Sequence, residues 1–374
     1  MKSKHLTMSE FVIKNPIMIG GCGSSGTSLL SHLLNSHPSI YCGSELFLLN
    51  KKKLYNDNSF KYLKSKFRSI LNKNSRNRLT KIFNPGNTIP TTGILKHDLL
   101  GDSTYTEKRQ DVTFIYEPES HGFTIEEVLK ITDKAENLKD FVDNFFGILL
   151  ARIGKNRWAE KTPTNCYCIG EFLSLYPSGK YVHIVRDGRD VVPSLIKRGT
   201  SPEIAVRRWI HDTSMGLPYR NNSRYYEVKY EDLVINPKLT LNKLMNFLGE
   251  SEDADLMIAG QTQSESMNSH STWTTKTTDP ISKKAIGKWK RESYENKHYL
   301  EQLFHYTKLY SEVSLSLGLD KEFNANDLLL KFGYNPSENW QPTPKYSQKL
   351  VVHFLQEKIG EVLCRKKMYC QVLL

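Results

Sequence analysis

The chain has 374 residues, and its 52 Lys and Arg against 40 Asp and Glu give a formal net charge of +12. With 39% hydrophobic and 11% aromatic residues the composition excludes a disordered chain, and the sequence shows no solenoid repeat. No apolar run reaches the ~18 residues of a transmembrane helix, residues 1–14 lack a signal-peptide core, and six Cys are too few for a disulfide scaffold. We therefore expect a cytoplasmic globular protein with an acidic partner: a nucleic acid, an anionic surface or a polyanionic small molecule.

The predicted elements begin with a strand over 16–20, a Gly/Ser-rich loop and a helix over 28–34, in which leucines recur at helical spacing. A helical excursion rich in Lys, Asn and Arg follows over 51–90. Further strands are predicted over 92–96, 157–160, 180–185 and 225–229. Further helices are predicted over 120–151, after Pro163, after Gly188, after Asn236 and over 296–317.

Short strands that alternate with longer helices predict an α/β fold with a parallel sheet covered by helices on both faces. We interpret 37–43 as a turn and the Ser/Thr-rich segment 254–280 as a loop or lid. One α/β domain is expected over 1–333. A C-terminal helical extension is expected over 334–374, where prolines precede an amphipathic run at 348–366.

A glycine-rich loop, Gly21-Cys22-Gly23-Ser24-Ser25-Gly26-Thr27-Ser28, lies between the first strand and the first helix. Its glycines permit positive φ angles that aim successive backbone N–H groups at an anion, and the helix N-terminus adds partial positive charge. The loop nearly fits the Walker A pattern and predicts a P-loop-type sheet, but Thr27 replaces the lysine that reaches the β- and γ-phosphates. A nucleotide 5′-phosphate whose transferred group is not a γ-phosphate suits this loop, and a turn without a ligand is the alternative.

A second candidate phosphate site follows the strand predicted over 180–185. Arg186 lies at the carboxyl end of this strand, where open α/β sheets bind ligands. Ser194 and Arg198 are four residues apart and share one face of the next helix. Two Arg and one Ser that converge there would bind another phosphate, and a solvated turn with an Arg186–Asp187 ion pair is the alternative.

Together these segments resemble the two nucleotide-binding signatures of the sulfotransferases that use 3′-phosphoadenosine-5′-phosphosulfate (PAPS). More narrowly, segments 20–29, 158–163 and 185–198 and Cys42-Gly43-Ser44-Glu45 are similar to tyrosylprotein sulfotransferases and their bacterial relatives. The matching motifs span 16–290.

The resemblance implies a set of nucleotide contacts. The glycine loop would hold the 5′-phosphosulfate of PAPS, and the Arg186 and Ser194 pair would hold the 3′-phosphate. Tyr230 and Lys288 match family positions near the nucleotide, and Thr277 matches one through a gapped alignment. The expected nucleotide-binding residues are Gly23, Ser24, Ser25, Gly26, Thr27, Ser28, Arg186, Ser194, Arg198, Tyr230, Thr277 and Lys288.

Sulfuryl transfer is an in-line displacement, which needs a base at the acceptor proton and positive charge near the leaving oxygen. Glu45 matches the glutamate base of the tyrosylprotein enzymes; a capping or surface role is its alternative, and His97 is the alternative base. Lys161, just past a predicted strand, is expected to stabilise the charge, unless it merely pairs with Glu160.

Two positions depart from the family pattern. Ser24 stands where the family usually has Arg or Lys, which leaves more of the transition-state charge to Lys161. Phe47 stands where the tyrosylprotein enzymes have an Arg that engages the acceptor peptide, which disfavours peptide tyrosine.

We expect PAPS as donor, 3′-phosphoadenosine-5′-phosphate (PAP) as product, no metal, and a hydroxyl or amine of a small molecule, anionic or not, as acceptor. A protein-tyrosine sulfotransferase is the nearest alternative. A P-loop nucleotide kinase should have the missing lysine and a carboxylate pair for magnesium, and a nucleic-acid-binding protein should show a helix-turn-helix, zinc or RNP signature. The sequence shows none of these, so no nucleic acid partner is expected, and a homodimer stays open.

Overall fold

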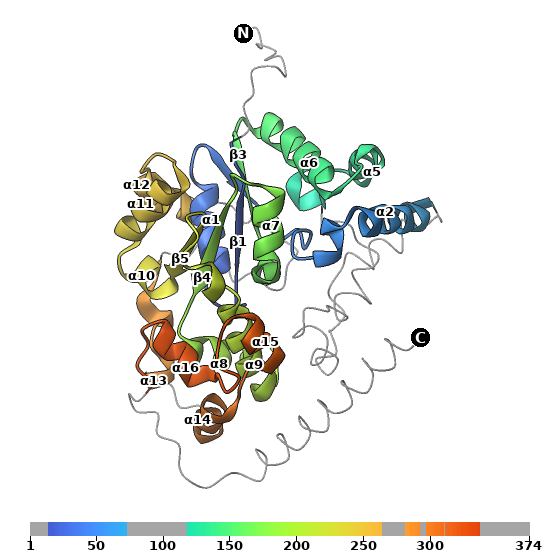
Figure 1. Cartoon of the computed structure of the whole chain (residues 1–374). Helices are drawn as coiled ribbons and strands as arrows, with labels where there is room; N and C mark the ends of the chain where they lie inside the picture. Colours follow the sequence, from blue (N-terminus) through green and yellow to red (C-terminus); the bar gives the residue numbers. More distant parts are fainter. Residues whose placement is uncertain (1–13, 73–117, 264–280, 292–296, 310, 337–374) are drawn as a thin grey trace, which may run out of the picture. The chain divides into compact units, whose positions relative to one another are not determined.

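The computed structural model describes residues 14–72, 118–263, 281–291, 297–309 and 311–336 (Figure 1). The chain divides into two compact units. The first comprises Met1–Ile89, Lys108–Val185 and Tyr219–Lys283, and the second comprises Pro90–Glu107, Arg186–Pro218 and Lys284–Leu374. Within the described ranges, no helix has both the length and the apolar character that a membrane span requires.

The first unit is built on a five-stranded sheet, which confirms the α/β class. Its strands are β1 (Ile17–Gly21), β2 (Ile40–Cys42), β3 (Arg157–Lys161), β4 (Lys180–Val185) and β5 (Tyr225–Lys229). They lie in the order β2-β3-β1-β4-β5, and all four neighbouring pairs are parallel. Because parallel strands run in one direction, their carboxyl ends share one edge of the sheet, and the residues that follow them gather there.

Two hydrophobic clusters cover the two faces of this sheet. Ile17 and Ile19 of β1 face one cluster and Met18 faces the other, as the two-residue period of a strand requires. On the Ile19 face lie α1 (Thr27–Asn35), α11 (Pro237–Leu248) and α12 (Ala254–Gln263); on the Met18 face lie α6 (Leu138–Ile153) and α7 (Ile169–Leu175) (Figure 1). The remaining elements of this unit are η2 (Lys52–Tyr55), α2 (Asp57–Asn72), η5 (Pro118–His121), α5 (Ile125–Lys134), η6 (Pro163–Cys168) and α10 (Tyr230–Ile235).

The second unit is helical where it is described. Its helices are α8 (Gly188–Lys197), α9 (Pro202–Ser214), α13 (Lys288–Arg291), α14 (Lys297–Tyr306), α15 (Ser311–Ser316) and α16 (Ala325–Lys331), and the short turns η7 (Leu217–Tyr219) and η8 (Lys283–Ala285) lie at its chain boundaries. Trp209 of α9 is fully buried and packs on Gly188, where a Cβ atom would lie 2.5 Å from the indole. Only glycine therefore fits at the start of α8 without moving that ring.

Several predicted boundaries were wrong. The helix expected over 120–151 is two helices, because Asn137 accepts a hydrogen bond from the Asp140 N–H at 3.0 Å and caps a new start. The turn expected over 37–43 contains β2, residues 254–263 form α12 instead of a loop, and the helix expected over 296–317 is divided into α14 and α15. The strand expected over 92–96 and the run at 348–366 lie outside the described residues.

Candidate functional site

The glycine loop joins β1 to α1 with three residues in the left-handed or positive-φ region. Gly21, Ser24 and Gly26 have φ angles of 150°, 68° and 95°. A positive φ is uncommon for a residue with a side chain, and at Ser24 it marks a backbone held in shape by its surroundings. Among the described residues no side chain caps the N-terminus of α1, which leaves its first N–H groups suited to an anion.

The loop also holds a buried hydroxyl that suits a ligand. Ser25 is fully buried, and its Oγ makes no hydrogen bond to any described residue. A buried polar atom without a partner costs free energy, and a bound phosphate or phosphosulfate would satisfy it. The residues present in the loop therefore fit the 5′ end of a nucleotide.

Tyr230, which the resemblance would put near the nucleotide, lies against this loop. It is the first residue of α10, directly after β5. A Cβ atom on Gly26 would lie 2.4 Å from Cδ2 of the Tyr230 ring, so the ring packs on the bare backbone of the glycine. The close approach ties the carboxyl end of β5 to the start of α1.

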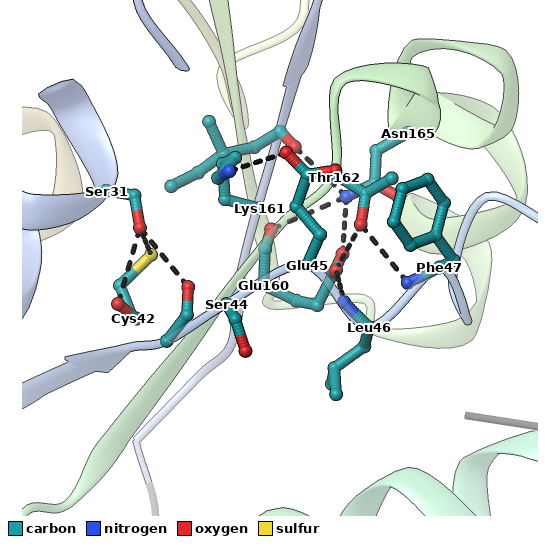
Figure 2. Close-up of polar contacts among 12 residues, drawn as sticks. Ser31, Cys42, Ser44, Glu45, Leu46, Phe47, Glu160, Lys161, Thr162 and Asn165 are labelled. Carbon is teal, nitrogen blue, oxygen red and sulfur yellow. Dashed lines mark hydrogen bonds and ion pairs between the residues drawn. The ribbon is translucent and has the colours of Figure 1, made fainter. Parts of the chain in front are cut away.

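Glu45 and Lys161 form an ion pair at the same sheet edge (Figure 2). The Lys161 Nζ and Glu45 Oε1 atoms are 2.7 Å apart, and the side chains are 6% and 28% exposed. Lys161 ends β3 and is paired in register with Ile19, two residues before Gly21 of the loop, whereas Glu45 follows β2. The two residues expected to carry the chemistry thus meet although 116 positions separate them.

Glu160 does not form the ion pair with Lys161 that the alternative interpretation required; its carboxylate binds neutral donors instead. Its Oε1 accepts hydrogen bonds from the Leu46 N–H at 3.2 Å and the Thr162 hydroxyl at 2.6 Å, and its Oε2 accepts one from Asn165 Nδ2 (Figure 2). The Thr162 Oγ1 also accepts from the Phe47 N–H at 3.3 Å. Burial raises the pKa of Glu160, and these hydrogen bonds oppose the shift.

His121 holds the other side of the Glu45 turn, and sequence reasoning missed it. Its Nε2 lies 2.9 Å from the Ser44 Oγ, and its Nδ1 lies 2.7 Å from the Tyr41 hydroxyl. Burial lowers the pKa of His121 to about 3, so the ring is neutral at pH 7. No local signal distinguishes it, because its partners lie 77 and 80 positions away. The other histidine of interest, His97, lies outside the described residues.

Four of the predicted nucleotide residues belong to the second unit: Arg186, Ser194, Arg198 and Lys288. The Arg186 Nη2 donates to the Ala285 carbonyl at 2.6 Å and lies 3.8 Å from the Asp190 carboxylate. Asp190 in turn accepts from the Gly287 and Trp289 N–H groups at 2.7 and 3.2 Å, which brings the segment that carries Lys288 beside Arg186. Burial raises the pKa of Asp190, although the Arg186 charge and these N–H groups oppose the shift.

Asp190 is the functional candidate that sequence reasoning missed in this unit. Its spacing of four from Arg186 on a predicted helix start was a usable signal. Asp187 receives the Arg189 guanidinium at 2.8 Å. Ser194 lies on α8 and is half-buried, whereas Arg198 is the C-terminal cap of α8 and is exposed. Thr277 lies outside the described residues.

The predicted site residues are thus grouped by unit. The loop, Glu45, Lys161 and Tyr230 belong to the first unit; Arg186, Ser194, Arg198 and Lys288 belong to the second. In the described part of the chain, no group of three or more His, Cys, Asp or Glu is arranged to hold a metal ion.

Comparison with known proteins identifies the family and the fold. A family model described as "Sulfotransferase family" matches residues 16–254, more than half of the chain. A protein-tyrosine sulfotransferase 2 of Gallus gallus is 21% identical over 290 residues, which are 73% of this chain and 62% of that protein. An omega-hydroxy-beta-dihydromenaquinone-9 sulfotransferase of Mycobacterium bovis is 28% identical over 110 residues, which are 24% of this chain and 28% of that protein. The chain thus spans less than two thirds of the length of the curated relatives it matches.

A solved structure, the sulfotransferase domain from the curacin biosynthetic pathway, has the same fold with a TM-score of 0.50. It is 15% identical, and the match covers 87% of this chain and 99% of that domain. At this identity the likeness concerns the fold alone, whereas the family model matches the sequence of residues 16–254. The chain belongs to the sulfotransferase family.

Proposed function

We propose that this transferase moves a sulfuryl group from PAPS to a hydroxyl or amine of a small-molecule acceptor. The observation that carries the proposal is the Glu45–Lys161 ion pair at the carboxyl edge of the sheet. The adjacent loop has a positive-φ backbone and a buried hydroxyl that has no hydrogen-bond partner among the described residues. When bound, PAPS supplies the sulfuryl group and a nucleotide leaving group. The loop N–H groups and the Ser25 hydroxyl would hold its 5′ end. Arg186, Ser194 and Arg198 would hold its 3′-phosphate, and the resemblance puts Tyr230 and Lys288 near the nucleotide.

Each member of the pair has one task in this reaction. Glu45 takes the proton of the acceptor O–H or N–H while a new S–O or S–N bond forms and the S–O bond to the nucleotide breaks. Lys161 stabilises the negative charge that develops on the leaving phosphate oxygen. Lys161 is almost fully buried, and a charge acts more strongly where water is excluded. Ser24 brings no charge to the loop, so this task falls on Lys161.

Nucleotide binding is the direct test of the donor. PAP at 100 times its dissociation constant should stabilise the fold by about 2.7 kcal/mol, which a thermal-shift assay detects. AMP lacks the 3′-phosphate and is the matched control. If PAP raises the melting temperature no more than AMP does, the donor assignment is refuted. Incubation with labelled PAPS and a panel of phenols, alcohols and amines then identifies the acceptor class.

A protein-tyrosine sulfotransferase is the second candidate, because a relative that covers 73% of this chain has that name. Phe47 argues against it, since the peptide-binding Arg of that group is absent here. Labelled transfer to a tyrosine peptide but not to free phenols would favour this second candidate. The cytoplasmic location and a homodimer stay predictions.

A further inference from the structure

We propose that Glu160 is a positioning residue that fixes the Glu45 turn against the end of β3, so that Glu45 and Lys161 meet. This inference rests on the proposed function, in which that pair carries the chemistry. Glu160 precedes Lys161 in β3, and it binds the backbone of the residue that follows Glu45. Two consecutive residues of the turn therefore bind two consecutive residues of the strand.

The pleat of β3 explains why both contacts are needed. Successive side chains of a strand point to opposite faces of the sheet, so Glu160 and Lys161 point in opposite directions. Lys161 lies on the α1 side, where its charge helps to lower the pKa of His32, after the larger effect of burial. Glu45 reaches Lys161 on that side, while the Leu46 N–H binds Glu160 on the other. The turn thus straddles the strand end and is held from both faces (Figure 2).

Glu160 also connects the Glu45 turn, through Asn165, to the end of β1, just before the glycine loop. Asn165 donates through Nδ2 to Glu160 Oε2 and to the carbonyl of Ile19, which lies two residues before Gly21. Thr162 donates to Glu160 and accepts from the Phe47 N–H, where the backbone has a φ of 50°. The Glu160 carboxylate therefore joins the Glu45 turn to the end of β3 directly, and it is connected to the end of β1 through Asn165.

The burial of Glu160 indicates that this role is not mere packing. The residue is 1% exposed, and the donors that hold it here are a backbone N–H, a hydroxyl and an amide. A buried carboxylate held by neutral groups is costly, and an apolar side chain would fill the space at lower cost. What the carboxylate adds is a set of three directed acceptor bonds at the base of the proposed catalytic pair.

The isosteric substitution Glu160→Gln tests the role of these hydrogen bonds, because it changes the shape of the side chain very little. Its Oε1 still accepts from Leu46 and Thr162, but its amide nitrogen faces the Asn165 Nδ2, so a donor opposes a donor. Asn165 cannot rotate its amide to relieve this without losing its bond to Ile19. A second variant, Thr162→Val, removes the bridge between Glu160 and Phe47 and leaves the carboxylate in place.

Glu250→Gln is the matched control. Glu250 is a buried carboxylate that binds Lys14 and Arg157, and Arg157 is the first residue of β3, at the opposite end of the strand from Lys161. Both Glu→Gln variants should lower the melting temperature. Glu160→Gln should lower kcat about 10- to 100-fold, as expected for a small displacement of a reacting group, and change the acceptor KM and the PAP dissociation constant less than about threefold. Glu250→Gln should keep kcat within about twofold of wild type.

A measurement without turnover separates the two proposals. Trace acetylation of lysines, quantified by mass spectrometry, should be several-fold faster at Lys161 in Glu160→Gln and Thr162→Val than in wild type, because the ion pair is loosened; it should be unchanged in Glu250→Gln. If wild type neither binds PAP nor consumes PAPS, the proposed function fails, but the acetylation rate of Lys161 still shows whether Glu160 holds the Glu45–Lys161 pair in place. The positioning role is overturned if Glu160→Gln and Thr162→Val both keep the kcat and the Lys161 acetylation rate of wild type. It is also overturned if Glu250→Gln changes these two quantities as much as they do.

Discussion

Gly26→Ala is the sharpest test of the glycine loop. The substitution adds one methyl group, and the structure gives it two separate costs. The φ of 95° at Gly26 is disfavoured for any residue with a Cβ, by about 1–2 kcal/mol. The new Cβ would also lie 2.4 Å from the Tyr230 ring, an overpacking that typically costs about 1–3 kcal/mol. We therefore expect a loss of about 2–5 kcal/mol in the free energy of unfolding.

Gly249→Ala separates the two costs. Gly249 caps α11 with a φ of 76°, and nothing lies within 4 Å of its Cβ position, so this variant bears the backbone cost alone. Urea unfolding of both variants, with and without PAP, gives the comparison. Gly249→Ala should keep the stabilisation of about 2.7 kcal/mol that PAP gives at 100 times its dissociation constant, and Gly26→Ala should lose most of it. Equal destabilisation of the two variants and equal stabilisation by PAP would refute the reasoning.

Three further perturbations test single groups. Glu45→Gln should lower kcat by about 10²- to 10⁴-fold while PAP still raises the melting temperature as in wild type; an active variant would remove Glu45 as the base. Asp190→Ala should weaken PAP binding, measured by calorimetry, because the N–H groups of Gly287 and Trp289 lose their acceptor; an unchanged dissociation constant would contradict this. His121 has a pKa of about 3 when folded against 6.5 unfolded, so the unfolded state binds the extra proton between these values and stability falls as pH drops below about 6.5. The slope should be smaller in His121→Gln by about 1 kcal/mol per pH unit on average, and by nearly 1.4 close to pH 5, in urea unfolding from pH 7 to 5; equal slopes would show that His121 does not titrate in this way.

The parts of the fold that local signals determine were predictable. The strand, glycine loop and first helix were predicted because Gly and Ser interrupt the pattern and the leucines recur at helical spacing. β2 was missed because three residues show no period, and the break between α5 and α6 was missed because one capping Asn interrupts an otherwise continuous apolar pattern. Each of these errors concerns a boundary or a very short element.

The candidate site was predictable in its members but not in its connections. Glu45 and Lys161 were identified from their motifs, yet their contact depends on the parallel register that aligns the ends of β2, β3 and β1. The same register brings Glu160 within hydrogen-bond distance of the Leu46 N–H, 114 positions away. Such contacts are properties of the sheet, and no periodicity within either segment encodes them.

The pairing of charges also changes how the net charge of +12 should be understood. Two cations of the candidate site lie within ion-pair distance of carboxylates: Lys161 beside Glu45 and Arg186 beside Asp190. A pair of opposite charges adds nothing to the sum, so the excess of 52 basic over 40 acidic residues has to arise elsewhere in the chain. A basic composition alone therefore cannot distinguish a nucleotide-dependent transferase from a nucleic-acid-binding protein. Under the proposed function the distinction would come from the partnered Lys161 charge in the first unit, near a loop whose buried Ser25 hydroxyl has no hydrogen-bond partner among the described residues, because such an arrangement suits one small anion better than an extended phosphate backbone.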